Sequence, residues 1–398
     1  MLDIVTPTRA LPGTSMDEET FEAFLVQLRR FVRERLIPAE PEVIEANRVP
    51  QRLLDEMRDL GLFALTTPEE LGGAGLSVSQ YIRTIRELGW PAPAYRTALS
   101  INTGMFTTAL KKSGTPEQQR EWMTRAAAGE IACFGLTEPD SGSDAAALKT
   151  RAVRDGDHYV LNGTKRYITN APIAKLGLIM ARTNAEPLPK NTHISAFLID
   201  MDAPGVTVGS PDHKMGQRGA LIADVILEDV RVPAANLLGG EEGKGFLAAM
   251  QALDSGRLSV GAAALGLAER ALESGLLYAT ERKAFGEPIA NFQLIQAMLA
   301  DSRADIYAAE CMMWDACAKA ERGRATLECS AFKMFSTEMC GRVVDRVVQI
   351  HGGAGYLAEY DAERLFRDAR IYRIYEGTTQ IQQLVIAKQM LRDVAARS

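Results

Sequence analysis

The segment YEGTTQ, residues 375–380, carries the side chain best suited to acid–base chemistry. Glu376 stands just ahead of a stretch with helical patterning, so its carboxylate could point into a cleft while neighbouring backbone N–H groups stay free. Taken alone, a glutamate near a helix start more often lies on the surface and complements the helix dipole. Glu376 is therefore a candidate base only if other motifs support it.

Two segments in the middle of the chain could hold a ligand. FGLTEPDSGSD, residues 134–144, supplies hydroxyls and a glycine, and successive N–H groups in such a turn can bind anionic ligand atoms. GTKRYITN, residues 163–170, is typical of a strand on which Tyr167 and Thr169 share a face that could meet a planar aromatic ligand. Taken alone, an ordinary turn and an ordinary strand explain these residue types at least as well.

A third segment, QIHGGAGY at residues 349–356, has paired glycines at the end of a helical pattern. A helix C-cap explains one glycine, whereas two plus a third indicate close backbone contact with a ligand. The sequence has no Ser-His-Asp nucleophile elbow, no phosphate-binding P-loop and no metal-spaced His/Glu pair. Hydrolase and phosphotransferase functions therefore lose support.

Composition narrows the class of protein. The 398 residues include 45 Lys plus Arg and 51 Asp plus Glu, for a net charge of −6, which disfavours a nucleic-acid binder. Hydrophobic residues at 46% and charged residues at 24% exclude wholesale disorder. No apolar stretch reaches the ~20 residues that a membrane span needs, and no signal peptide is evident, so we expect a cytoplasmic location. Five cysteines without Cys-x-x-Cys spacing and four histidines predict reduced thiols and no structural zinc.

The elements that position these motifs fall into three regions, which we expect at residues 1–130, 131–237 and 238–398. The first is predicted to be α-helical: Ser15 and Glu18 fit a capping box, and apolar residues then repeat at helical spacing from Phe21 to Leu36. The second has short apolar runs between turns, which predicts a β domain with strands at 158–161, 178–181, 194–199 and 225–232. The third predicts a four-helix bundle with helices at 246–282, 292–322, 326–349 and 379–394.

Together, in this order and at these separations, the motifs resemble the acyl-CoA dehydrogenase family of flavoenzymes. The resemblance covers nearly the whole chain and implies an α+β multidomain fold with an N-terminal helical domain, a middle β-barrel-like domain and a C-terminal four-helix bundle. Further matching segments are PEELGG from residue 68, LNGTKRYITNA from 161, KMGQRG from 214, EDVRVP from 228, DSGR from 254 and ERKAFGEPIANFQ from 281.

The resemblance implies a homotetramer, or dimer of dimers, with one FAD per subunit between the β domain and the bundle. The family more often has Trp where Tyr167 stands, so flavin stacking is expected to differ here. Residues expected to contact FAD are Phe134, Leu136, Thr137, Gly142, Ser143, Tyr167, Ile168, Thr169, Thr378 and Gln380. Residues similar to those that reach the FAD of a neighbouring subunit are Arg282, expected at the pyrophosphate, with Phe285, Gln293, Gln349, Gly352 and Gly353.

The resemblance also implies the reaction, which is α,β-dehydrogenation of an acyl-CoA to a trans-2-enoyl-CoA. Glu376 is expected to take the α-proton, flavin N5 the β-hydride, and an electron-transfer flavoprotein the electrons. Some relatives carry the base one residue before the arginine of DSGR, but that position is Gly256 here, which leaves Glu376 as the candidate. Residues expected to contact substrate are Ser143, Asp254, Arg257, Tyr375 and Gly377.

The substrate class stays open at this point. Arg96 in YRTALS matches an arginine with which glutaryl-CoA dehydrogenases bind a distal carboxylate, whereas DSGR and the NFQ at 291–293 resemble short- and medium-chain enzymes. Because arginines mostly lie solvated or paired on surfaces, a surface or structural role for Arg96 is preferred. Alternatives on the same scaffold are an acyl-CoA oxidase, a flavin monooxygenase and, disfavoured by the acidic charge, a DNA-associated binding protein.

Overall fold

The computed structural model describes residues 16–323 and 325–396. Ser15, expected in the first capping box, lies outside the described residues. The first helix begins at Glu18, and Asp17 is its N-cap, because the Asp17 side chain accepts a hydrogen bond from the backbone N–H of Thr20 at 2.8 Å.

The N-terminal region is helical, as predicted, and its apolar stripe from Phe21 to Leu36 is buried. Short π-helical segments continue α1 (Val32–Leu36), link α5 to α6 (Ile101–Phe106) and link α7 to α8 (Gln119–Met123). The helices are α1 (Glu18–Phe31), α2 (Glu40–Ala46), α3 (Gln51–Asp59), α4 (Val78–Glu87), α5 (Pro93–Ser100), α6 (Thr107–Ser113), α7 (Pro116–Gln118) and α8 (Thr124–Ala127).

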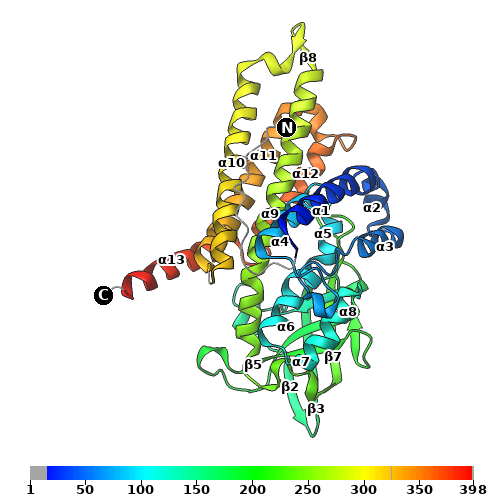
Figure 1. Cartoon of the computed structure of the whole chain (residues 1–398), viewed down its shortest axis with the longest axis vertical. Coiled ribbons are helices and arrows are strands. Elements are labelled where there is room, and N and C mark those ends of the chain that lie inside the picture. Colours follow the sequence, from blue (N-terminus) through cyan, green and yellow to red (C-terminus); the bar gives the residue numbers. More distant parts are fainter. Residues whose placement is uncertain (1–15, 324, 397–398) are drawn as a thin grey trace.

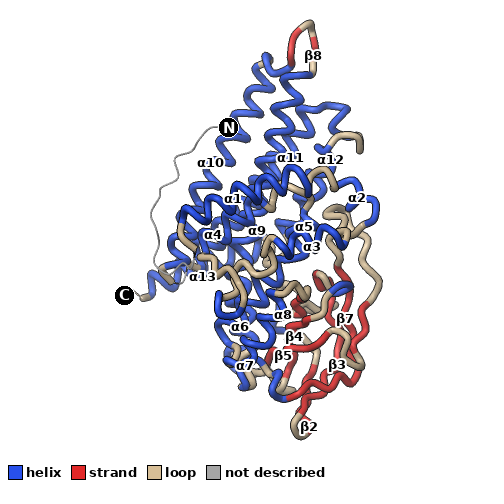
Figure 2. The backbone as a smooth tube through the Cα atoms, turned by 45° about the vertical axis from the view of Figure 1, so that its right-hand side comes forward, coloured by secondary structure: helices blue, strands red, loops and turns tan. Residues whose placement is uncertain are grey.

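The middle region is a seven-stranded sheet that gathers on one side of the molecule (Figure 2). The strand expected at 158–161 extends to Thr169, so the turn at its start and the Tyr167 motif at its end belong to one strand, β3. Strand order is β1-β4-β2-β3-β7-β6, with β5 paired to β4. The strands are β1 (Ala132–Gly135), β2 (Arg151–Asp155), β3 (His158–Thr169), β4 (Leu176–Arg182), β5 (Ile194–Asp200), β6 (Val206–Val208) and β7 (Ile222–Pro233).

The C-terminal region is built on three long helices that lie side by side, and the first of them, α9, continues down to the sheet (Figure 1). A small hairpin of β8 (Lys283–Ala284) and β9 (Glu287–Pro288) joins the first two at the tip farthest from the sheet (Figure 1). The helices are α9 (Gly245–Glu281), α10 (Gln293–Glu321), α11 (Thr326–His351), α12 (Asp361–Ala369) and α13 (Thr379–Ala395).

The helix bundle differs from the expected one in two of its members. The short helix α12 was not predicted, and it packs against α9 and α11. The expected fourth helix, α13, contacts α11 near its start and then projects away from the body of the chain (Figure 1). Its apolar residues Leu384, Leu391 and Val394 are 65%, 72% and 66% exposed, so this chain alone does not bury them.

One apolar core joins α1, α4 and α5 of the N-terminal region to α9, α10 and α11. A second core lies between β1, β4 and β5 and the helices α6 and α9. These shared cores fix the sheet and the two helical regions relative to one another, which is what a site between them requires. Among the described helices, none is long and apolar enough to cross a membrane. The region boundaries and the cytoplasmic location stay predictions.

Candidate active site

Glu376 lies in a tight turn between the 3-10 turn Arg370–Arg373 and the first turn of α13. Its backbone has φ +53° and that of Gly377 has φ +88°, both in the left-handed region, which a glutamate adopts only when its surroundings hold it there. The turn directs the Glu376 side chain at α9, where it meets Gly256. A methyl group at position 256 would collide with Oε2, so the glycine leaves the room that the carboxylate occupies.

The carboxylate of Glu376 is poised to accept a proton. Its Oε2 atom is buried and has no hydrogen-bond partner among the described residues. Burial raises the pKa of Glu376, and the positive charges of Arg96, Lys333 and Arg257 oppose that rise. A carboxylate with a free oxygen and a raised pKa is suited to general-base chemistry near neutral pH.

Arg96 is not on the surface, so of the two roles preferred from the sequence, surface or structural, the surface role is wrong. It is 3% exposed, on α5, and its charge acts on Glu376. Its guanidinium donates to Ser259 Oγ at 2.8 Å and to the Tyr375 hydroxyl at 3.3 Å. Its Nε has no partner within the described part of the chain, so a buried charge keeps one donor available.

Asp254 and Arg257, expected to contact substrate, lie on the same stretch of α9 as Gly256. The Arg257 guanidinium donates to Asp254 Oδ1 at 2.5 Å and is 7% exposed. Tyr375 adjoins Glu376 in the chain, and burial raises the pKa of its hydroxyl to about 12, so it stays protonated. The structure therefore brings Arg96, Tyr375 and this α9 stretch together around Glu376.

The loop at residues 134–144 is organised from within by Glu138. Its carboxylate pairs with the buried ammonium of Lys165 at 2.7 Å and accepts from the backbone N–H groups of Lys149 and Thr150. This arrangement leaves Gly142 and Ser143 exposed and available to a ligand. The carbonyl of Thr137 accepts from the backbone N–H of Arg166 at 2.8 Å, which joins this loop to the end of β3.

Tyr167 and Thr169 lie on the open side of β3, as predicted. The Tyr167 ring is 58% exposed, and its φ of +58° falls at a break in the β3–β7 register. The Ile168 side chain points the other way and is buried in the core of the sheet, which leaves its main chain for any ligand contact. Phe134 and Leu136 are likewise buried, behind the loop.

These residues fit an FAD. An exposed aromatic ring beside a threonine hydroxyl suits the planar flavin, and the Ser/Gly loop at 134–144 suits its phosphates. Thr378 and Gln380 lie at the start of α13, and the Thr378 side chain accepts from the N–H of Ile381 as its N-cap.

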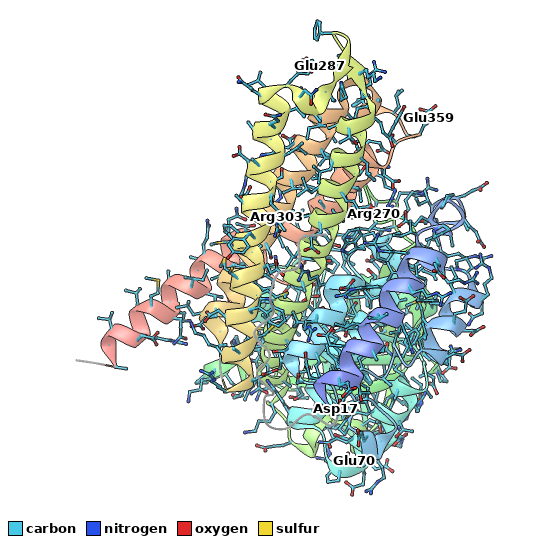
Figure 3. All side chains as sticks on the ribbon, turned by 45° about the horizontal axis from the view of Figure 1, so that its top comes forward. Asp17, Glu70, Arg270, Glu287, Arg303 and Glu359 are labelled. Carbon is cyan, nitrogen blue, oxygen red and sulfur yellow. The ribbon has the colours of Figure 1, made fainter. Side chains whose placement is uncertain are left out.

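A second predicted FAD-binding set lies far from the first. The β8–β9 hairpin lies at the tip farthest from the sheet (Figure 1), and the members of this set flank the hairpin in the chain or adjoin Ile350, which shares a small apolar core with Ile289. Glu287 of the hairpin marks this outer tip (Figure 3). All members of this set are exposed, with Phe285 at 97%: Arg282, Phe285, Gln293, Gln349, Gly352 and Gly353. One chain does not bring the two sets together.

Sequence reasoning missed two side chains that hold the Glu376 turn. The Lys333 ammonium on α11 donates to the Gly377 carbonyl at 2.7 Å. The Gln382 side chain donates to the carbonyls of Glu376 at 3.2 Å and Gly377 at 3.0 Å. A signal for Lys333 exists, because it falls on the buried face of a predicted helix, and a buried ammonium requires a partner.

Models of the acyl-CoA dehydrogenase family match the three regions in order. The N-terminal domain matches residues 18–130, the middle domain residues 133–230 and the C-terminal domain residues 243–391. The chain is 41% identical over 367 residues to the probable acyl-CoA dehydrogenase YngJ of Bacillus subtilis (strain 168), covering 92% of this chain and 96% of that protein.

Two further relatives are similar over most of their length. Identity is 40% over 376 residues to the human mitochondrial short-chain specific acyl-CoA dehydrogenase, covering 94% of this chain and 90% of the relative. Identity is 41% over 354 residues to subunit CarC of the caffeyl-CoA reductase-Etf complex of Acetobacterium woodii, covering 88% and 92%.

Solved structures agree with the fold and with the cofactor. Butyryl-CoA dehydrogenase from Megasphaera elsdenii superposes with a TM-score of 0.90 at 34% identity, covering 95% of this chain and 100% of that chain. A glutaryl-CoA dehydrogenase from Mycobacterium smegmatis in complex with FADH2 superposes with a TM-score of 0.87 at 29% identity, covering 94% and 95%. The fit of Tyr167, Thr169 and the 134–144 loop to a flavin is consistent with that complex.

Proposed function

Because the chain belongs to the acyl-CoA dehydrogenase family and its cofactor is FAD, we propose that it oxidises an acyl-CoA thioester to the trans-2-enoyl-CoA. Glu376 is its base, and Tyr375, Gly377, Asp254, Arg257 and Ser143 line the path of the substrate. The proposal rests chiefly on one observation: the buried, unpartnered Oε2 of Glu376 opposite Gly256.

The reaction needs a base held over a weakly acidic C–H bond. Glu376 Oε2 takes the proton from the carbon next to the thioester carbonyl, and the backbone N–H of Glu376 donates to that carbonyl to stabilise the developing negative charge. The chemistry supplied by bound FAD is acceptance of the β-hydride at flavin N5. The positive charges of Arg96 and Arg257 oppose the rise in the pKa of Glu376 that burial causes, and so favour the ionised form that a base needs.

The test is anaerobic titration of the FAD-loaded protein with acyl-CoA thioesters while the flavin absorption is recorded. Bleaching of the flavin band by a saturated acyl-CoA is expected. The Glu376→Gln protein should remain yellow and FAD-loaded, because an amide and a carboxyl group have nearly the same shape. Its rate of flavin bleaching should fall by about four orders of magnitude, which is the upper end of a general base's contribution. Comparable bleaching in Glu376→Gln would place the base elsewhere.

The electron acceptor we propose is an electron-transfer flavoprotein, consistent with a relative that is named as part of an Etf complex. The alternatives on this scaffold, an oxidase or a flavin monooxygenase, predict rapid reaction of the reduced enzyme with oxygen. Oxygen consumption that matches substrate loss in a purified assay would favour them over a dehydrogenase.

A dicarboxylyl-CoA substrate is a second candidate, favoured by the buried Arg96. Its unpartnered Nε and the neighbouring Ser259 hydroxyl offer a cation and a hydrogen-bonding group to the far end of a short acyl chain. Turnover of butyryl-, isobutyryl-, octanoyl- and glutaryl-CoA with an artificial acceptor compares the classes. Glutaryl-CoA turnover that Arg96→Met selectively removes supports this candidate, and absence of glutaryl turnover in the wild type rules it out.

We also propose that the chain assembles as a homotetramer, a dimer of dimers. The exposed residues around the β8–β9 hairpin and the exposed Tyr167 motif would then meet at one FAD, each from a different subunit. The uncovered apolar face of α13 gives the assembly a surface to bury. A dimer of dimers predicts four times the chain mass by light scattering.

A further inference from the structure

The turn that carries Glu376 is fastened to α11 at both of its ends. Glu338 of α11 accepts from the Arg373 guanidinium at 3.1 Å before the turn and from the Thr379 hydroxyl at 2.7 Å after it. Between these points Lys333, on the same helix, donates to the Gly377 carbonyl at 2.7 Å. α11 therefore determines where the turn lies relative to α9.

Lys333 is in an unusual position for a lysine. Its side chain has no exposed area, and the Gly377 carbonyl is its hydrogen-bond acceptor. Burying an ammonium costs free energy unless its environment compensates for the lost water. The Gly377 carbonyl compensates in part by accepting a hydrogen bond from the ammonium. Burial lowers the pKa of Lys333 to about 8, and the negative charge of the nearby Glu376 carboxylate opposes that decrease.

The backbone of the turn explains why it needs an external donor. Glu376 and Gly377 both have positive φ, a conformation that for a glutamate costs free energy, on the order of 1–3 kcal/mol. Carbonyls in such a turn lack the partners that a helix or a strand would supply. Gln382 donates to these carbonyls from α13, and within residues 16–323 and 325–396 Lys333 is the only charged side chain that donates to one of them.

Charged and titratable groups face Glu376 from each element packed against it. Arg96 lies on α5, Arg257 on α9 and Lys333 on α11. Tyr81 on α4 and Tyr375 in the turn itself also feel the Glu376 charge, and both stay protonated near neutral pH, because burial raises the pKa of each hydroxyl. Of the three cations, Arg96 and Arg257 make no hydrogen bond to the turn's main chain, whereas Lys333 does.

We propose that Lys333 is a positioning residue for proton abstraction: its ammonium, bound to the Gly377 carbonyl, holds the left-handed turn that aims the Glu376 carboxylate at Gly256. This inference rests on the proposed function, in which Glu376 is the base. Lys333 itself does not touch the substrate. It acts through the backbone of the turn and through its charge.

The kinetic test compares Lys333→Met and Lys333→Gln as FAD-loaded enzymes, with Lys319→Met as control. Lys319 is 46% exposed on α10 and pairs with Asp315 and Glu328, so its variant also removes a paired lysine, but one whose ion pairs do not involve the turn. Lys333→Met should slow single-turnover flavin reduction by about 10²-fold, the cost of misplacing a reacting group by about 1 Å. FAD content and the concentration dependence for acyl-CoA should change little.

The pH dependence separates positioning from general destabilisation. Loss of the Lys333 charge raises the pKa of Glu376 further, so the acid limb of the rate profile should move to higher pH by about one unit. Lys333→Gln keeps a donor for the Gly377 carbonyl without the charge, so it should recover much of the rate and keep the shifted limb. Lys319→Met should reproduce the wild-type profile.

A crystal structure of the FAD-loaded Lys333→Met enzyme gives a readout that does not depend on turnover. The expected result is a Glu376 carboxylate displaced from Gly256, with residues 376–377 out of the left-handed region. Wild-type turn geometry, or a wild-type rate and pH limb in both variants, would overturn the proposal. If Lys333→Met does not fold, the test is the flavin-reduction rate of Lys333→Gln and the acid limb of its pH–rate profile: a shifted limb supports the proposal, and a wild-type rate and limb overturn it.

Failure of the proposed function has a different signature. In that case the wild-type enzyme shows no flavin bleaching with any acyl-CoA. The position of the Glu376 carboxylate in the Lys333→Met crystal structure then still shows whether Lys333 holds the turn.

Discussion

At the scale of single residues, Gly256 and Glu376 form a complementary pair on α9 and the turn before α13. The glutamate occupies the volume that a side chain at position 256 would take. This explains in steric terms how a chain with glycine at this place on α9 has room for a carboxylate at position 376. The two positions cannot both carry a side chain in the geometry seen here.

Gly256→Ala tests this pairing. The added methyl group collides with Oε2 and displaces the carboxylate, so flavin reduction by substrate should fall by about 10²-fold with FAD binding retained. Stopped-flow absorption measures the rate. Ser255→Ala, one residue earlier on α9, is the matched control and should behave as the wild type. A wild-type rate in Gly256→Ala would contradict the steric argument.

The raised pKa of Glu376 has a consequence for stability. A carboxyl group whose pKa is higher in the folded state binds its proton more tightly there. Its favourable contribution to the free energy of unfolding is therefore largest at low pH and is lost as pH rises through the pKa of the folded state. Glu376→Gln should therefore raise the melting temperature at pH 7 to 8, and this gain should shrink as pH falls towards 5. Melting curves across that range check it, and a gain that grows on acidification would contradict it.

At the scale of elements, a buried charge cluster ties α2, α9 and α12 together. Glu40 of α2 is 4% exposed and pairs with Arg270 of α9 at 2.8 Å and with Arg364 of α12 at 2.9 Å. Arg270 also donates to Asp361 at 2.7 Å, at the first residue of α12. The cluster lies where the N-terminal helices meet the long helices, which Figure 3 marks at Arg270. It holds the two helical regions in the relative position that the active site needs.

Glu40→Gln should destabilise the protein by about 3–5 kcal/mol, because it leaves two buried arginines without their shared carboxylate. Denaturant unfolding of the FAD-loaded protein measures the change. Glu34→Gln is the control, since Glu34 is 58% exposed and its pair with Arg30 is worth about 0.5 kcal/mol or less. A change for Glu40→Gln no larger than for the control would mean that the cluster does not bind the regions together.

At the scale of the whole molecule, the chain is long, with the sheet at one end and the β8–β9 hairpin at the other (Figure 1). One set of residues predicted to bind FAD lies around the hairpin, the other lies where the end of β3 meets the helices, and the apolar face of α13 is exposed. In the proposed assembly, a single subunit therefore holds only part of each FAD site.

Phe285→Ala tests this assembly. The Phe285 ring is 97% exposed, so its removal should leave the unfolding of the chain unchanged while it weakens FAD retention and shifts the mass towards smaller assemblies. Light scattering and the ratio of flavin to protein absorption measure both effects. Val153→Ala, which trims a side chain 63% exposed on β2, is the control. Full FAD content and unchanged mass in Phe285→Ala would argue against a shared site.

The sequence by itself determined most of the helices and strands, the family and the cofactor. Helical spacing from Phe21 to Leu36 predicted a buried stripe, and strand alternation predicted that Tyr167 and Thr169 share one face of β3. The family and its FAD cofactor also followed from the sequence, because motifs in a fixed order can be recognised without knowing how the chain packs. These features depend on residues close to one another in the chain.

Only the tertiary structure decided which faces meet. Arg96 bonds to Ser259, 163 residues away, and Lys333 to Gly377, 44 residues away, and no local pattern encodes either contact. The same holds for the projection of α13 and for the room that Gly256 leaves. Periodicity shows which face of a helix or strand is apolar. Which other element packs against that face depends on the close packing of the whole core, to which distant segments of the chain contribute.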